Sequence, residues 1–381
     1  MMEIESKRNH MRKLVFFVLF ALAAPLLVSQ NGSAPQDKRL AELRAKRERG
    51  ETMTPEERDY VLSAQEAQME VNSAKHSTAW ASAHPAQTST GAIPLTDLGK
   101  GKYKGEQGGL YPNGENTPPP AHLKAGLALA KSIVPLDRNG HPSADGKVVL
   151  MSIGMSNGTQ EFRSFITLAT AHRPELNPRL VIVDGAQSSQ VASKIVDPNL
   201  PYWNTPLTQL KDAGVTPEQV QAIWIKEADM EPKEPFPTEV KKLQSELVTI
   251  VHHLHDKFPN TKLIYLSSRI YGGYSLRPLN PEPHAYETGF AVKWLIADQI
   301  AGKPELNYDP AKGPVRAAWL GWGPYIWADG VKPSKAGLVW TRDDLSPDGV
   351  HPSVQGREKV AKLLLAFFEK DPTTVSWFAK H

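Results

Sequence analysis

The sequence predicts an α/β fold, a three-layer αβα sandwich in which a mostly parallel, five-stranded sheet lies between two layers of helices. From residue 145 onward, short continuous apolar runs alternate with segments whose apolar residues recur every three or four positions. Such runs are typical of parallel strands that helices cover on both faces. The expected strands are Lys147–Ile153, Leu180–Asp184, Ala222–Lys226, Lys262–Ser267 and Val315–Leu320. The expected helices are Thr159–Ala171, Thr238–Phe258, Tyr286–Ala301 and Val354–Phe368.

The composition supports one sizeable core and excludes several classes of protein. The chain has 381 residues, of which 40% are hydrophobic, so a large interior can be buried. It contains no cysteine, which excludes disulfides, thiolate metal sites and a cysteine nucleophile. Lys and Arg number 44 against 41 Asp and Glu, and the resulting net charge of +3 is too weak for a nucleic-acid-binding protein. No nucleic-acid partner is therefore expected.

Residues 1–30 have the pattern of a secretory signal. Basic residues between Lys7 and Lys13 precede the apolar run Leu14–Val28. This run is shorter than the about 20 residues that a membrane-spanning helix needs. We expect either a cleaved signal peptide or an uncleaved N-terminal anchor, and a secreted or periplasmic protein of a bacterium. The membrane would be contacted only through such an anchor.

Two further segments precede the α/β domain. Residues 31–75 are charged and are expected to form a helical spacer, with a helix from Pro55 to about Val71 that Thr54 and Glu57 begin as a capping box. Residues 76–144 are rich in Gly and Pro and end in an entry helix. Their irregular part is either a linker or a segment wrapped onto the next domain. The domain itself is expected to span 145–381.

Candidate catalytic residues stand where ligands bind in parallel α/β sheets, beyond the carboxyl ends of the strands. The first expected strand ends in Gly154-Met155-Ser156-Asn157-Gly158, so Ser156 lies on a tight turn before a helix. A serine at a helix N-terminus can be a nucleophile, although Ser-Asn-Gly is also ordinary turn chemistry. Asp348 and His351 precede the last helix. Their spacing lets the carboxylate orient Nδ1 of the imidazole while Nε2 faces a serine.

The pair of motifs G-x-S-N and D-G-x-H-P-x-x-x-G resembles the SGNH (GDSL-type) hydrolase superfamily, closest to its sialate O-acetylesterase and carbohydrate-esterase branch. The resemblance covers roughly residues 145–370 and implies a flavodoxin-like fold. It implies that Ser156 is the nucleophile, His351 the general base and Asp348 its orienting partner. The N–H groups of Ser156 and Gly185 would form the oxyanion hole, and neither a cofactor nor a metal would be needed.

The third conserved block of that superfamily is altered in this chain. The carbohydrate branch has G-E-S-D/N, whereas the third strand ends here in Lys226-Glu227-Ala228-Asp229. The usual side-chain amide donor of the oxyanion hole is missing, and such a loss costs about 3 to 4 kcal/mol. Either Lys226, Asn157 or a backbone amide substitutes for it, or the enzyme is slow, or the domain no longer catalyses a reaction.

Four further side chains are candidates for binding substrate. Glu227 and Asp229 are expected to hold a sugar hydroxyl or a cation, or else to be structural carboxylates paired with Lys226 or Arg269. Arg269 and Tyr271 follow the fourth strand, where they contact substrate or close a loop over the core.

A group of aromatic residues and a group of histidines can likewise have either a binding role or a structural one. The aromatic residues after the fifth strand either stack on a sugar ring or pack beneath residues 100–120. The histidines of the second expected helix do not share one face, so no catalytic metal is predicted. The aromatic residues are Trp322, Tyr325 and Trp327, and the histidines are His252, His253 and His255.

The sequence thus predicts a secreted serine esterase that acts through an acyl-serine intermediate. Its substrate is expected to be a small-molecule or polysaccharide ester, with O-acetyl groups on a carbohydrate preferred. The alternative is a catalytically impaired SGNH-like domain that binds a glycan or a cell-envelope polymer.

Overall fold

The computed structural model describes residues 35–49, 51, 53, 54, 56, 57, 60, 61, 64, 68 and 78–380. The expected signal or anchor, residues 1–30, lies outside the described residues. In the described part of the chain, no helix has both the length and the apolar character needed to cross a membrane.

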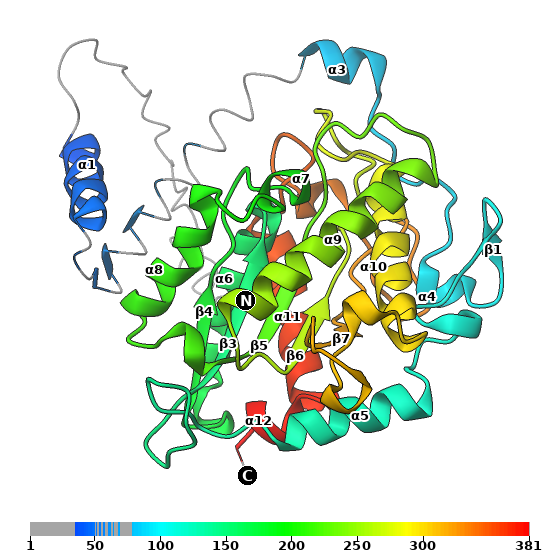
Figure 1. Cartoon of the computed structure of the whole chain (residues 1–381). Helices are drawn as coiled ribbons and strands as arrows, with labels where there is room; N and C mark the ends of the chain where they lie inside the picture. Colours follow the sequence, from blue (N-terminus) through cyan, green and yellow to red (C-terminus); the bar gives the residue numbers. More distant parts are fainter. Residues whose placement is uncertain are drawn as a thin grey trace, which may run out of the picture.

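The central sheet has five strands, all parallel, in the order β4-β3-β5-β6-β7. This is the 2-1-3-4-5 order of flavodoxin-like sheets, and it confirms the predicted fold class (Figure 1). Every residue of β3, β5, β6 and β7 is buried, because helices cover both faces, while the edge strand β4 is only partly buried. The strands are β3 Val148–Gly154, β4 Leu180–Asp184, β5 Val220–Lys226, β6 Leu263–Leu266 and β7 Trp319–Trp322.

The fifth strand begins later than the sequence predicts. Residues 315–318 were expected to open it, but the N–H groups of Arg316 and Ala317 both donate to the Asn307 carbonyl, at 2.8 and 3.2 Å. These donors are therefore not available to the ladder with β6. Pairing begins only at Trp319, which lies opposite Leu263.

The long helices pack in pairs. Helix α6 (Ser156–Ala171) packs against α11 (Val354–Lys370), and α9 (Thr238–Lys257) against α10 (His284–Ile300), one pair on each face of the sheet (Figure 1). All four lie close to the bounds that the sequence predicts. The other helices are α1 Pro35–Glu48, α3 Thr78–Ala83, α4 Leu95–Leu98, α5 Pro120–Lys131, α7 Ala192–Ile195, α8 Asn204–Asp212 and α12 Val375–Phe378, and a small hairpin joins β1 Lys102–Tyr103 to β2 Glu106–Gln107.

Residues 87–118 wrap onto the α/β domain rather than linking it loosely. The indole N–H of Trp322 donates to the Leu110 carbonyl at 2.7 Å, and the Tyr286 hydroxyl donates to the Ile93 carbonyl at 2.8 Å. The carboxylate of Asp329 accepts four hydrogen bonds from residues 89–91, at 2.5 to 3.0 Å. Side chains of the domain therefore satisfy backbone groups of a segment that has almost no regular structure of its own.

In the spacer before this wrap, residues 35–48 are helical, and so are the described residues between Glu56 and Gln68. The Thr54 N–H donates to Glu57 Oε2 at 2.8 Å and the Glu57 N–H to Thr54 Oγ1 at 3.2 Å, which are the two bonds of the predicted capping box. Leu43, Met53 and Val61 form a small apolar cluster separate from the main core. The spacer thus packs on itself.

We expect the Asp329→Ala variant to release the start of the wrap. Losing the carboxylate removes four hydrogen bonds, two of them from backbone N–H groups, and should ease local opening by about 1.5–3 kcal/mol. Limited proteolysis should cut residues 84–95 roughly 10- to 100-fold faster than in wild type. Asp145→Ala, at a surface carboxylate, is the control. Equal cleavage rates in the Asp329 variant and the control would show that these bonds do not hold the wrap.

Candidate active site

Ser156 is the first residue of helix α6, immediately beyond the end of β3. The turn between them needs glycine at Gly154, because a Cβ there would lie 2.6 Å from the Lys226 carbonyl oxygen of the neighbouring strand. This close approach lets the chain turn within one residue from strand to helix. Ser156 remains partly exposed, whereas Met155 and Asn157 on either side are buried.

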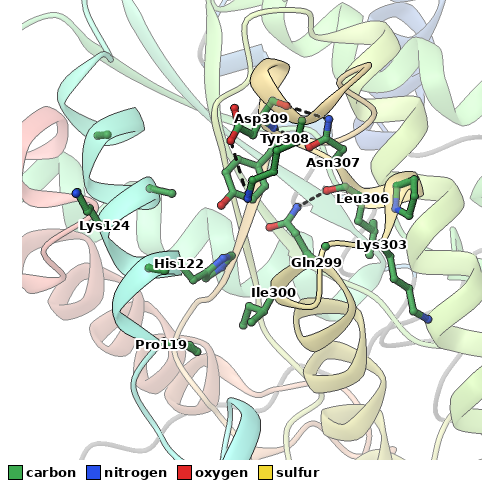
Figure 2. A pocket seen from close by; sticks show the side chains of 16 residues that line it. Pro119, His122, Lys124, Gln299, Ile300, Lys303, Leu306, Asn307, Tyr308 and Asp309 are labelled. Atoms are coloured by element: carbon green, nitrogen blue, oxygen red, sulfur yellow. Dashed lines mark hydrogen bonds and ion pairs between the residues drawn. The ribbon is translucent and has the colours of Figure 1, made fainter.

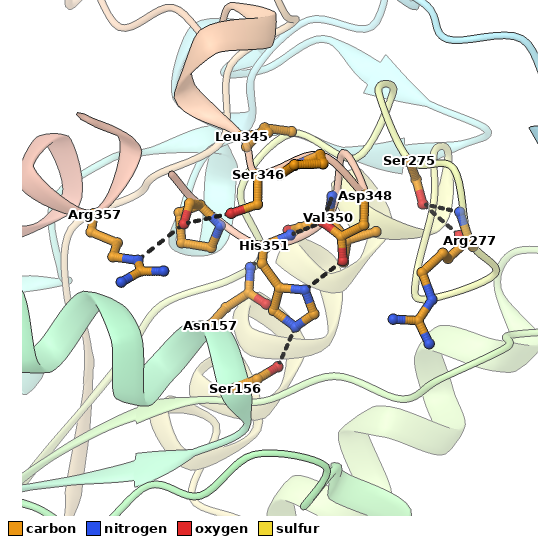
Figure 3. A network of polar contacts seen from close by, with 12 residues as sticks. Ser156, Asn157, Ser275, Arg277, Leu345, Ser346, Asp348, Val350, His351 and Arg357 are labelled. Carbon is orange, nitrogen blue, oxygen red and sulfur yellow. Dashed lines mark hydrogen bonds and ion pairs between the residues drawn. The ribbon is translucent and has the colours of Figure 1, made fainter. Parts of the chain in front are cut away.

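Ser156, His351 and Asp348 form one unbroken chain of hydrogen bonds (Figure 3). Ser156 Oγ lies 2.9 Å from His351 Nε2, and His351 Nδ1 lies 2.6 Å from Asp348 Oδ2. With the proton on Nδ1 donated to the carboxylate, Nε2 is free to accept from the serine. The imidazole is 12% exposed and the carboxylate is fully buried. The geometry is that of a nucleophile, its base and the group that orients the base.

Asp348 is held as an anion. Burial by itself would raise its pKa, but the hydrogen bond and the charge of His351 outweigh burial, and the N–H groups of Val350 and His351 donate to Oδ1 at 3.0 and 3.1 Å. Together these contacts hold the pKa of the Asp348 carboxyl well below its ordinary value. The carboxylate therefore stabilises the imidazolium that forms when His351 accepts a proton.

Neighbouring elements fix the loop that carries His351 and Asp348. The amide of Asn157 donates to the Val350 carbonyl at 3.0 Å, and the Leu276 N–H donates to the Asp348 carbonyl at 2.9 Å. Gly349 has a φ of +68°, and a Cβ there would lie 1.8 Å from the Tyr274 carbonyl oxygen. Only glycine fits this position. The base is thus anchored both to helix α6 and to the loop after β6.

Three of the expected oxyanion donors are already engaged, which corrects the sequence-based assignment. The Gly185 N–H donates to the carbonyl and hydroxyl oxygens of Ser152, at 3.1 and 3.2 Å, within the sheet. The side-chain amide of Asn157 is held by Val350, as described above. Lys226 is fully buried in an ion pair with Glu161. The structure leaves the backbone N–H groups of Ser156 and Asn157, which open α6 and precede its first intrahelical bonds, as donors beside Oγ.

The Lys226–Glu161 pair joins strand β5 to helix α6 below the nucleophile. Lys226 Nζ lies 2.5 Å from both carboxyl oxygens, and both side chains are 0% exposed. Burial lowers the pKa of Lys226 to about 8 and raises that of Glu161, while their mutual attraction opposes both shifts. Lys226, which stands where the SGNH pattern has glycine, therefore has a structural role and links β5 to α6.

Asp184 also links the sheet to α6, a role that the sequence analysis did not predict. Its carboxyl group, at the end of β4, accepts from Ser152 Oγ at 2.6 Å and from Thr159 Oγ1 in the first turns of α6. Burial raises its pKa to about 6, although these hydrogen bonds work against the shift. The sequence feature that could have identified Asp184 is its place as an acidic residue at the end of an apolar strand.

The four expected substrate-binding side chains are all buried, which contradicts that prediction. Glu227 and Arg269 are each 2% exposed, and Tyr271 is fully buried with its hydroxyl donating to the Gln87 carbonyl of the wrap at 2.8 Å. Asp229 pairs with Lys242 at 2.6 Å. The sequence correctly placed these residues at strand ends, but their side chains turn inward, or toward a neighbouring helix, instead of facing a ligand.

Of the three aromatic residues at the end of β7 and after it, Trp322 packs beneath residues 100–120 as the second alternative predicts, with its indole N–H donating to the Leu110 carbonyl. The other two bond outside that segment. The Tyr325 hydroxyl accepts from the Leu95 N–H at 3.1 Å, and the Trp327 indole donates to Glu282 at 2.8 Å.

Candidate metal ligands lie elsewhere. In the second long helix, His252 and His253 bond to the carbonyls of Glu305 and Val196. Within the described ranges, one group of side chains is close enough together to hold a metal ion, and it lies at the far end of α6 from Ser156. This group is His172, Glu175 and Glu369.

A cavity of about 490 Å³ lies away from the triad, between helix α5 and the end of α10 (Figure 2). His122, Gln299 and Tyr308 are among its lining residues. Gln299 donates to the Ala318 carbonyl at 3.0 Å, directly before β7 begins. In a parallel sheet the beginnings and ends of the strands lie at opposite edges, so this cavity and Ser156 are on different sides of the molecule.

Comparison with known proteins gives a limited set of matches. No protein-family model matches the chain, and no curated protein matches its sequence. A lipase from a goat rumen metagenome is similar in structure, with 15% identity, covering 59% of this chain and 100% of that chain, at a TM-score of 0.35. A catalytic mutant of an acetylxylan esterase from Geobacillus stearothermophilus shows 15% identity, 61% and 97% coverage, and a TM-score of 0.35. Both neighbours are ester hydrolases by name.

We expect Lys226→Met to destabilise the protein by about 3–5 kcal/mol, because it leaves the Glu161 carboxyl buried without its partner. The double variant Lys226→Met/Glu161→Leu should recover most of this loss, since both polar groups are replaced by apolar ones of similar size. Urea unfolding of the two single variants and the double variant measures the coupling. A single variant as stable as wild type would show that the pair does not tie β5 to α6.

Glu227 should behave as a neutral acid. Neither of its carboxyl oxygens has a hydrogen-bond partner among the described residues, and burial raises its pKa well above the ordinary value. A pKa raised in the folded state means that stability falls as pH rises above the unfolded value of about 4.3. Glu227→Gln lacks this loss, so its Tm should exceed that of wild type by a margin that grows from pH 5 to pH 8. A constant margin would contradict a protonated Glu227.

Proposed function

We propose that the chain is a serine hydrolase of carboxylic esters, with Ser156 as nucleophile, His351 as general base and Asp348 as the group that orients and stabilises the base. The observation that carries the proposal is the Ser156–His351–Asp348 chain of hydrogen bonds at the carboxyl edge of the sheet. A partly exposed serine at a helix N-terminus, bonded to a histidine that is bonded to a buried carboxylate, is arranged for acyl transfer.

In the first half-reaction, Ser156 Oγ attacks the ester carbonyl carbon while its proton passes to His351 Nε2. The tetrahedral intermediate collapses as the C–O bond to the alcohol breaks, and the imidazolium returns the proton to the leaving oxygen. Water then attacks the acyl-serine, with His351 taking its proton and returning it to Ser156 Oγ. The acid is released and the starting state is restored.

The oxyanion of each tetrahedral intermediate needs donors beside Ser156. We assign this role to the backbone N–H groups of Ser156 and Asn157, where the positive end of the α6 dipole adds to the stabilisation. Asn157 contributes to the reaction a second time through its side chain, which holds the Val350 carbonyl and so positions His351.

The finer part of the proposal is that the ester is an O-acetyl group on a carbohydrate and that the protein acts outside the cytoplasm. The resemblance of Gly154–Asn157 and Asp348–Pro352 to the carbohydrate-esterase branch supports the substrate class. The basic and apolar pattern of residues 1–30 supports export.

A catalytically impaired domain that binds a glycan is the second candidate. It is favoured because the side-chain amide of Asn157 and the ammonium group of Lys226 are both engaged elsewhere. The two candidates differ in whether Ser156 is activated.

We expect a fluorophosphonate probe to label wild type at Ser156 and wild type to hydrolyse 4-nitrophenyl acetate. Ser156→Ala should lose labelling and lower kcat by at least about a thousandfold, and Asp348→Asn should lower it by about 10³- to 10⁴-fold through the wrong imidazole tautomer. Ser143→Ala, at another partly exposed serine, is the control and should behave as wild type. If wild type and Ser156→Ala react equally slowly and neither is labelled, the glycan-binding candidate is favoured.

A further inference from the structure

The ends of helices α6 and α11 bring three metal-ligating side chains together at the surface. His172 caps the C-terminus of α6, Glu175 ends the 3-10 turn that follows, and Glu369 lies in the last turn of α11. His172 Nδ1 lies 3.5 Å from Glu175 Oε2 and 3.9 Å from Glu369 Oε1. One donor atom from each residue lies within 4.8 Å of the other two, so the three converge on a common point.

These separations suit ligands of one ion better than hydrogen bonds. A hydrogen bond between a charged nitrogen and a carboxylate is about 2.7–2.9 Å long, and both distances from His172 are longer. Zinc bonds of about 2.0–2.2 Å in a tetrahedral arrangement place neighbouring ligand atoms about 3.4 Å apart. In the part of the chain that the structure describes, His172 is the one basic side chain that pairs with either carboxylate.

The main chain that carries these ligands is held in place without an ion. The His172 carbonyl accepts from the Glu175 N–H at 3.0 Å, and the Glu175 carbonyl accepts from the Lys380 N–H at 2.9 Å. Phe368, directly before the third ligand, packs on Phe165 of α6 with the ring centroids 5.4 Å apart. Binding an ion would therefore cost the motion of three side chains and little else, which favours affinity.

The charge around the three side chains also favours a cation. Asn157, near the start of α6, bonds to Val350 shortly before α11 begins, and His172 meets Glu369 where both helices end. The two helices thus run in the same direction, and the negative ends of their dipoles coincide. Carboxylates at this place are disfavoured unless a cation joins them. The side chain of Glu175 is 74% exposed, so an ion can enter from solvent.

We propose that His172, Glu175 and Glu369 form a zinc site, with water in the fourth position. An imidazole nitrogen and carboxylate oxygens are ordinary ligands of Zn²⁺, whereas Mg²⁺ and Ca²⁺ prefer oxygen alone. At 1.5 Å per residue, the site lies about 24 Å along α6 from Ser156. The ion therefore takes no part in the proposed reaction, and it clamps α6 to α11 at the end remote from the catalytic residues.

The test is a calorimetric titration of the chelator-treated full chain, prepared without a histidine tag, with ZnCl₂. We expect one site that is tighter than any other, and a rise in Tm of roughly 4 to 8 °C at a free zinc concentration a hundred times the Kd. MgCl₂ and CaCl₂ at the same concentration should not raise Tm. His172→Ala and Glu369→Gln should each weaken zinc binding at least about 100-fold, because a ligand matters more than the groups behind it.

His141→Ala is the matched control, since His141 is an exposed histidine 3.8 Å from the single carboxylate of Asp137 and should not contribute to the site. Its zinc affinity should equal that of wild type. Co²⁺ in place of Zn²⁺ should give the visible absorption of a four-coordinate site in wild type and in the control, and lose it in His172→Ala.

Two results would overturn the inference. One is a His172→Ala variant that binds zinc as tightly as wild type, and the other is a wild-type Tm that zinc does not raise. Comparing the Tm values of the metal-free proteins shows whether each variant is folded, because a change at these surface side chains should leave Tm within a few degrees. None of these measurements needs turnover, so either result leaves the proposed function untouched.

Discussion

The parallel sheet constrains every part of the site, because all five strands end at one edge and the chain leaves β3 and β5 toward opposite faces. A crevice opens where neighbouring strands part in this way. Ser156 stands at the head of α6, just beyond the end of β3. The Asp348–His351 loop comes from much later in the chain, and it can reach Ser156 only because α11 packs beside α6 on the same face.

Holding that geometry requires polar groups in places where water cannot reach them. Lys226 and Glu161 are fully buried and Asp184 is half-buried, and their side chains connect the first turns of α6 to the ends of β4 and β5. Burying charges is costly unless they are paired, and an apolar replacement of the pair is often as stable. The pair instead fixes the position of α6 relative to β5, because an ion pair at 2.5 Å allows the helix and the strand fewer relative positions than apolar contacts do. The bonds that place the nucleophile are made by Thr159 and Glu161, within the first one and a half turns of α6.

Sequence reasoning located the sheet and the triad because both depend on local pattern. Continuous apolar runs identify buried parallel strands, and a serine after one strand with D-x-x-H before the last helix identifies the reacting groups. It failed for Glu227, Arg269 and Tyr271, since a residue at a strand end turns inward or outward according to what packs around it.

Because the expected oxyanion donors are engaged elsewhere, parts of the substrate away from the ester carbonyl become more important for the rate. In the proposed mechanism the oxyanion is met by the backbone N–H groups of Ser156 and Asn157, and one missing donor costs about 3 to 4 kcal/mol of transition-state stabilisation. Binding energy from groups remote from the carbonyl can offset this cost when it holds the ester in the position for attack.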